Sequence, residues 1–302
     1  MLKAVGFQPQ FLLASNLPPV AEITKITASF PLPHWFQTLL VRVVIDGEPY
    51  YINDTDQYAW LGTTPRDGKL AILLPELTYE TISAARNCHE ATNTTYSISL
   101  QDNGNARIKV KNEYYGMAFA EKNRSLIGQK PSNNQLAPDK HYYQKAVSAI
   151  DQGAKAVGNL DFDFYGLPGI EEFTVDIPNF GVVDGGFLYF NLPFTPSFLG
   201  TATDSRALPF YVSQAKSKTI RFEITLPQSY RQVDIAPGNE SFTAPDGSGS
   251  VHIKTEYEKN SLTITYEINS CPAILTPEEY SEVKAIGTIL KGKGIRMILM
   301  EK

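Results

Sequence analysis

The chain has 302 residues and a formal net charge of −5, and it has no cluster of Lys and Arg interleaved with aromatic residues. These features argue against nucleic acid as a partner. Its apolar runs fall short of the ~20 residues of a membrane-spanning helix, and its first residues lack the continuous apolar segment of a signal peptide. With 42% hydrophobic residues, 16 Tyr, 16 Phe and 20 Pro, the composition favours a β-rich protein of two or three domains.

The first 76 residues have the pattern of a helix end followed by short strands. Met1–Val5 resembles a last helical turn, and Gly6 is a typical helix stop. Asp46-Gly47, between two apolar runs, predicts a hairpin turn. The strands expected here are Phe11–Ala14, Leu39–Ile45, Pro49–Asn53 and Leu70–Leu74, with a proline-rich loop over Asn16–Pro33.

From about Thr78 onward, alternating strands dominate. Asp102-Asn103-Gly104 predicts a hairpin between Tyr96–Leu100 and Ala106–Lys111. A second hairpin is expected between Val251–Tyr257 and Leu262–Ile268. Further strands are expected at Phe173–Ile177, Gly186–Leu192, Thr219–Leu226 and Ile295–Met300. Short strands joined by close turns favour antiparallel β-sandwich structure.

Two helices are expected among these strands. Lys140–Val157 has apolar residues at near-helical spacing. The second helix begins at Thr276, a typical N-cap, with Pro277 at the first helical position and Glu279 completing a capping box. The sequence therefore predicts an α+β fold that is mostly β, with two helices.

The most distinctive phrase is Phe36–Gly62. An apolar strand leads into Ile45-Asp46-Gly47, and Tyr50-Tyr51-Ile52, Thr55-Asp56, Tyr58 and Gly62 follow. This order resembles the segment of bacterial transglutaminase-like (papain-type) domains that carries the catalytic His and Asp. Further phrases follow in the order of that family's β-rich C-terminal region: Phe190–Pro193, Arg206–Pro209, Phe222–Pro227 and Pro277–Tyr280.

The resemblance implies a degenerate active site. It places Thr38 where the family has its His and Asn53 where the family has its Asp, and the family's nucleophilic Cys would lie upstream of Met1. The His generates the thiolate and the Asp orients its imidazole, whereas Thr accepts no thiol proton near neutral pH. We expect Thr38 and Asn53 to hydrogen-bond to each other, and to line a ligand cleft with Trp35 and Tyr51.

Nearby titratable residues are weak substitutes for the lost groups. His34 lies in a proline-rich segment, where an exposed surface His is the commoner case. Asp56 flanks position 53, whereas Asp54 would face the opposite side of a strand from Asn53. Cys88 and His89 would also point to opposite faces of an extended chain, so we do not expect them to form a dyad.

Other patterns have simple structural explanations. Asp161 and Asp163 would share a strand face ~7 Å apart, which suits a cation, but a solvated strand face explains them better, as it does Glu171-Glu172. Gly287–Lys293 has the spacing of a phosphate loop, but it ends a helix instead of beginning one. Three aromatic segments fit a stacking platform and core packing equally well: Glu113–Tyr115, His141–Tyr143 and Phe187–Phe190.

The two cysteines, Cys88 and Cys271, lack metal-ligand spacing, so we expect no metal and no cofactor. A disulfide between them and two free thiols both remain open.

We expect three regions. Residues 1–76 form the C-terminal half of a degenerate transglutaminase-like domain, 77–215 a β-rich domain with one inserted helix, and 216–302 a β-sandwich with a capped helix. The resemblance implies a protein exported to the periplasm or cell surface, whose missing N-terminal half packs on residues 1–76. The expected role is non-catalytic binding or scaffolding of a peptide or glycan. The alternative is a cysteine peptidase or acyltransferase whose nucleophilic Cys lies upstream.

Overall fold

The computed structural model describes residues 4, 6–52, 56–85, 88–127, 140–194, 197, 199, 206–213, 215–230, 232–244 and 246–302. Strands dominate this part of the chain, and four α-helices accompany them. The mostly-β α+β class predicted from the sequence is confirmed. Within the described ranges, no helix is long and apolar enough to cross a membrane.

The N-terminal sheet has five antiparallel strands in the order β3-β2-β1-β4-β5. Its strands are β1 (Gln10–Ser15), β2 (Phe36–Ile45), β3 (Glu48–Ile52), β4 (Leu70–Leu74) and β5 (Thr78–Thr81). The predicted turn at Asp46-Gly47 joins β2 to β3, and both residues have positive φ, as a two-residue hairpin turn requires. One face of this sheet buries a small core that includes Leu12, Leu40 and Ile82.

The largest sheet has eight strands in the order β15-β16-β17-β13-β6-β7-β9-β8. They are β6 (Ala91–Leu100), β7 (Ala106–Tyr115), β8 (Lys155–Asp163), β9 (Gly169–Ile177), β13 (Lys216–Thr225), β15 (Glu240–Thr243), β16 (Gly249–Glu258) and β17 (Ser261–Ser270). Both predicted hairpins, β6–β7 and β16–β17, are present. The pairing of β6 with β13 is parallel, so the expected regions 77–215 and 216–302 share one sheet. The region boundaries themselves stay predictions.

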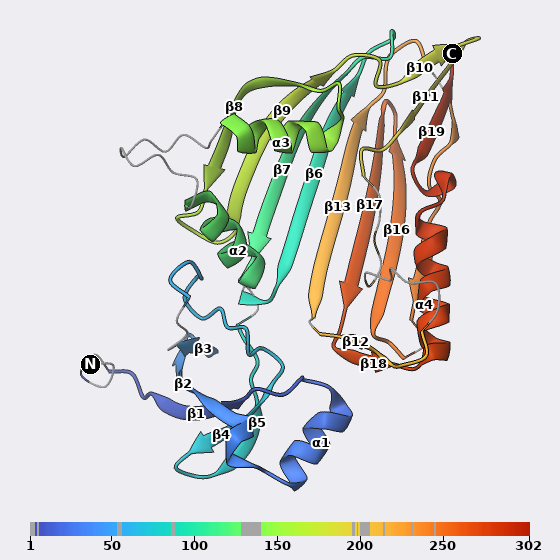
Figure 1. The fold of residues 1–302 in the computed structure, drawn as a ribbon. Coiled ribbons are helices and arrows are strands. Elements are labelled where there is room, and N and C mark those ends of the chain that lie inside the picture. The colour runs from blue at the N-terminus through green and yellow to red at the C-terminus, as the bar shows by residue number, and fades with distance from the viewer. Residues whose placement is uncertain are drawn as a thin grey trace.

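The main core covers one face of the eight-stranded sheet. A smaller sheet packs there, formed by β10 (Val182–Asp184), β11 (Phe187–Asn191), β19 (Met297–Glu301) and β14 (Gln232–Ile235). Helix α4 (Pro277–Leu290) contributes to the same core, and β12 (Phe210–Val212) pairs with β18 (Ala273–Leu275) beside it. The N-terminal sheet lies at one end of the large sheet, near α2 and below α3 (Figure 1).

Two of the four helices were not expected. Helix α1 (Ala21–Ser29) lies inside the predicted loop Asn16–Pro33, so that part of the prediction is wrong. Its N-cap, Val20, makes no side-chain cap bond, which explains why the sequence carries no start signal. Helix α2 (Gly116–Ile127) begins directly where β7 ends.

The two expected helices are present, one of them shorter than predicted. Helix α3 (Lys140–Ile150) ends before Val157, because Asp151 Oδ1 accepts a hydrogen bond from the Gly153 N–H and closes a turn. The chain then enters β8 at Lys155. Helix α4 starts with the predicted capping box, in which Thr276 and Glu279 exchange hydrogen bonds.

A buried carboxylate fixes α2 and α3 to the sheet. Glu171 of β9 is only 2% exposed, so the prediction that it lies on a solvated face is wrong. It alternates with Phe173 and Val175 on the core face, whereas Glu172 points outward and pairs with Lys109. Lys122 of α2 lies 2.8 Å from Glu171 Oε1. Hydroxyl and amide donors complete the cluster, namely Asn112, Tyr114 and Tyr142.

Removing the cation from this cluster should destabilise the protein strongly. Because Glu171 would remain buried without its charge partner, we expect Lys122→Met to lower the free energy of unfolding by about 3–5 kcal/mol. The matched control is Lys254→Met, which breaks an exposed ion pair with Glu256 and should cost less than about 0.5 kcal/mol. Chemical denaturation measures both, and equal losses would contradict the structural role of the cluster.

Candidate functional site

Thr38 lies on β2 opposite Ala14 of β1. Its hydroxyl donates a hydrogen bond to Asn16 Oδ1 at 3.3 Å, and Asn16 Nδ2 in turn reaches Gln37 Oε1 at 3.4 Å. The predicted partner Asn53 lies outside the described residues, so the Thr38–Asn53 bond stays a prediction. The polar partner that the structure gives Thr38 is Asn16.

The other predicted cleft residues have different environments. Trp35 is half-buried in a short 3-10 helix (Pro33–Trp35), and its ring contacts the exposed His34 ring edge-to-face at 5.7 Å. Tyr51 is only 3% exposed and accepts a hydrogen bond from the Ser83 N–H. It pairs with Arg42, four residues along β2 from Thr38, or about 13 Å at the rise of an extended strand. Tyr51 thus belongs to the small core, while Trp35 and Thr38 reach the surface.

Asp56 is engaged in holding a loop. It forms an ion pair with Arg124 of α2 and accepts a hydrogen bond from the Tyr58 N–H at 3.0 Å. The Arg124 guanidinium also lies over the Tyr58 ring, and Asn123 donates to the Tyr58 carbonyl. The Asp56 side chain is only 12% exposed. Asp56 therefore fastens the loop after β3 to α2, which leaves it poorly placed to orient an imidazole.

Cys88 and His89 have separate partners although they are neighbours in sequence. Cys88 is buried, with its thiol 3.6 Å from the Leu61 carbonyl, and it packs with Ala84, Ala85 and Trp60. Burial raises the pKa of the Cys88 thiol. Neither Cys88 nor Cys271 forms a disulfide.

His89 forms the second half of a His–Asp pair. Its Nδ1 lies 2.6 Å from Asp67 Oδ2, and Asp67 Oδ1 accepts a hydrogen bond from the Ala84 N–H at 2.8 Å. The imidazole is 48% exposed and its orientation is fixed by a carboxylate that is itself anchored. Sequence analysis missed this pair, because its members lie 22 positions apart and no periodic or motif signal links them.

Two glycines allow close contacts around Cys88 and His89. A Cβ at Gly116 would lie 2.6 Å from the carbonyl carbon and oxygen of His89, so only glycine fits at this φ of +56°. A Cβ at Gly62 would lie 2.5 Å from the Tyr50 ring. The backbone of 88–89 therefore passes directly beneath the junction of β7 and α2.

A cleft of about 710 Å³ opens beside His89, between the two sheets. Its floor is the outer face of the eight-stranded sheet, where Ser217, Ala91 and Tyr115 lie in register on neighbouring strands. Its other polar and aromatic lining residues are Glu48, Tyr50, His89 and Asn93. The cleft thus joins residues from both sheets, and the anchored imidazole is on its wall.

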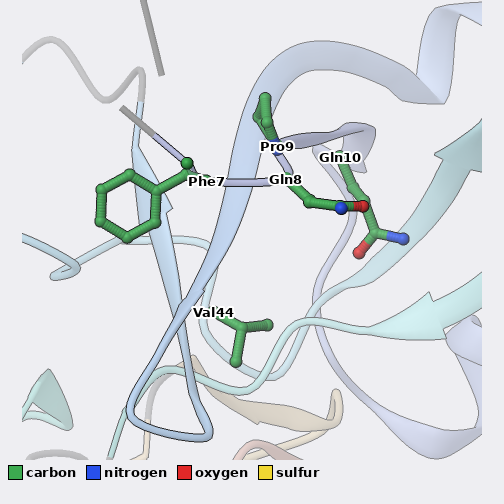
Figure 2. Close-up of a pocket in the computed structure, with 6 residues that line it drawn as sticks. Phe7, Gln8, Pro9, Gln10 and Val44 are labelled. Atoms are coloured by element: carbon green, nitrogen blue, oxygen red, sulfur yellow. The ribbon is translucent and has the colours of Figure 1, made fainter. Parts of the chain in front are cut away.

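A second pocket, of about 870 Å³, lies beside the segment Gly6–Gln10 and Val44. Figure 2 shows Phe7 and Gln10 on different sides of the opening, with Val44 of β2 between them. None of its described lining residues is titratable. The described lining of this pocket could therefore bind a ligand, but it supplies no acid or base for catalysis.

The aromatic residues for which the sequence left a stacking platform and core packing open lie in different places. Tyr114 and Tyr142 bind the buried Glu171, and Tyr143 packs against Phe173. Tyr115 lines the cleft. Phe187 and Tyr189 are partly exposed on β11, in the smaller sheet.

Comparisons with known proteins give limited matches. A family model described as a domain of unknown function with a solved structure (DUF3858) matches residues 187–293, about a third of the chain. No curated protein matches. A crystal structure described as that of a putative protease from Parabacteroides distasonis ATCC 8503 aligns with 100% of this chain, at 13% identity and a TM-score of 0.49. The chain spans 41% of the length of that protein.

The two thiols should differ in reactivity. The raised pKa of Cys88 means that less of it is thiolate at neutral pH, whereas Cys271 is exposed. We expect iodoacetamide to alkylate Cys271 first in the native protein, and the difference to shrink as pH rises or when denaturant is added. Mass spectrometry of digested protein measures both rates, and equally fast native labelling of Cys88 would contradict its burial.

Proposed function

We propose that this chain is the C-terminal portion of a transglutaminase-like protein and acts as a non-catalytic binding or scaffolding module for a peptide or glycan. The phrase within Phe36–Gly62 supports the kinship. The matched family region, 187–293, also contains the four later phrases that resemble the C-terminal part of those proteins. The same kinship underlies the proposals that the protein is exported and that an N-terminal half packs on residues 1–76.

The observation that carries the non-catalytic role is the environment of Thr38. Its hydroxyl bonds to Asn16, which bonds to Gln37, and none of these side chains accepts a proton near neutral pH. Thiol-based acyl transfer needs a base at this position to generate the thiolate. His34 contacts Trp35, and Asp56 is held by Arg124, so the described geometry does not join these two weak substitutes into a His–Asp pair.

A scaffolding role is supported by the way the two sheets are fastened. The loop after β3 is tied to α2 by the Asp56–Arg124 ion pair and by packing of Trp60 on Phe119, with ring centroids 6.1 Å apart. Phe119 continues this contact to Phe164 at 5.1 Å. Polar and aromatic contacts together hold the loop after β3 against α2, and a fixed arrangement of this kind favours ligand recognition.

Activity assays separate the non-catalytic role from the enzyme alternative. We expect the full-length protein, including the proposed N-terminal half, to show no amide hydrolysis and no amine incorporation with a glutamine-containing peptide above the blank. We expect the same of His34→Ala, because no step depends on that imidazole. Turnover by the wild type that is lost in His34→Ala would contradict the proposal and support the cysteine peptidase or acyltransferase.

Ligand binding can be measured by thermal unfolding of the full chain against a panel of short peptides and neutral oligosaccharides. A ligand that binds only the folded state at 100 times its Kd stabilises that state by about 2.7 kcal/mol, and the Tm rises accordingly. We expect at least one member of the panel to raise the Tm in this way. A panel without any such member would contradict the binding role.

A further inference from the structure

The cleft between β3 and the large sheet is lined by a negatively charged side chain, which favours a cation as its ligand. Glu48 stands exposed at the start of β3, and none of the described lining residues is Lys or Arg. The basic side chain that interacts with the lining residue Tyr115, Lys111, is already paired with Glu113 at 2.8 Å. A positively charged group entering the cleft therefore meets a carboxylate without meeting a competing cation on its walls.

The remaining lining groups suit the same ligand. Tyr50 and Tyr115 bring two aromatic rings, whose faces attract ammonium and guanidinium groups. Asn93 uses its Nδ2 to reach Glu113 at 3.3 Å, which leaves Oδ1 as an acceptor. These groups offer oxygen acceptors and ring faces, as a hydrogen-bonding cation requires.

His89 adds a nitrogen acceptor on the cleft wall. Donation from Nδ1 to Asp67 leaves a lone pair on Nε2 of the neutral imidazole. Protonation would place a positive charge on the cleft wall and oppose a bound cation. The charged and titratable groups around the cleft are Glu48 and Tyr50 of β3, Asp67 and Lys69 just before β4, Glu90 just before β6, Tyr115 and the Lys111–Glu113 pair of β7, and Lys216 of β13.

We propose that this cleft binds an organic cation, namely the ammonium or guanidinium group of a basic peptide. The assignment rests on the proposed role of the chain as a binding module, and it names both the ligand chemistry and a site separate from Trp35 and Thr38. Glu48 supplies the counter-charge, Tyr50 and Tyr115 the ring faces, and His89 an acceptor that is present only in its neutral form.

Isothermal titration of the full chain with five probes tests the assignment. The probes are an end-blocked tetrapeptide containing one lysine, its arginine, glutamine and glutamate versions, and a neutral tetrasaccharide. We expect the lysine and arginine peptides to bind, and the other three not to bind. Raising the salt concentration should weaken binding, because the counter-charge Glu48 is exposed.

Variants locate the site. We expect Glu48→Gln to weaken binding of the lysine peptide at least 10-fold and Tyr115→Ala several-fold, with the Tm unchanged for Glu48→Gln. The matched control is Glu258→Gln, which removes the same charge at the hairpin of β16 and β17, the opposite end of the large sheet from Ser217. That control should bind as the wild type does.

The acceptor role of His89 can be tested with two substitutions at pH 7.5. We expect His89→Ala, which removes the Nε2 acceptor, to weaken binding of the lysine peptide, and His89→Gln, whose side chain keeps an oxygen acceptor, to weaken it less. An unchanged affinity in His89→Ala, or equal weakening in both variants, would overturn the assigned role of this imidazole.

The outcomes of these titrations also distinguish failure of the cation site from failure of the proposed binding role of the chain. If the tetrasaccharide or the acidic peptide binds, and Glu48→Gln leaves its affinity unchanged, the cation assignment is overturned and the binding role stands. If all five probes fail, the cation assignment is overturned, and the wider thermal-unfolding panel decides the binding role separately. Equal weakening by Glu48→Gln and Glu258→Gln would overturn the location of the site.

Discussion

The close approach of two backbone segments at Gly116 is the constraint on which the rest of this structure depends. Here the end of β7 turns into α2 directly over residues 88–89, with no room for a side chain. This contact fixes where the connection between the two sheets passes, and hence where β6 begins. It also sets the position of Cys88 in the small cluster and of His89 on the cleft wall.

Electrostatic and apolar contacts then hold α2 in place on both sides. Toward the large sheet, Lys122 reaches the buried Glu171, and toward the N-terminal sheet Arg124 reaches Asp56. Phe119, on the same helix, packs against Trp60. A single helix therefore joins a buried charge cluster to the loop after β3, and the cleft follows from the fixed separation of the two sheets.

Local sequence signals predicted most of the helices and strands. They could not predict contacts between residues that lie far apart in the chain. The Asp102–Gly104 turn and the Thr276 capping box are complete within a few residues, so the sequence identifies both. Helix α1 has no N-cap signal at Val20 and was missed. Glu171 and Glu172 are adjacent, and composition does not tell which one faces the core. The Asp67–His89 and Thr38–Asn16 contacts each join residues 22 positions apart, without a motif.

Hydrogen exchange of a Gly116→Ala variant tests the central constraint most directly. The control is Gly158→Ala, at a glycine with a similarly positive φ of +72° but nothing within 4 Å of the added Cβ, so backbone strain is matched and the close approach is not. We expect faster exchange at the amides of Ala84 and Cys88, which bond to Asp67 and Ala85, in Gly116→Ala alone. Unchanged exchange at these amides in Gly116→Ala, or equal acceleration in both variants, would contradict it.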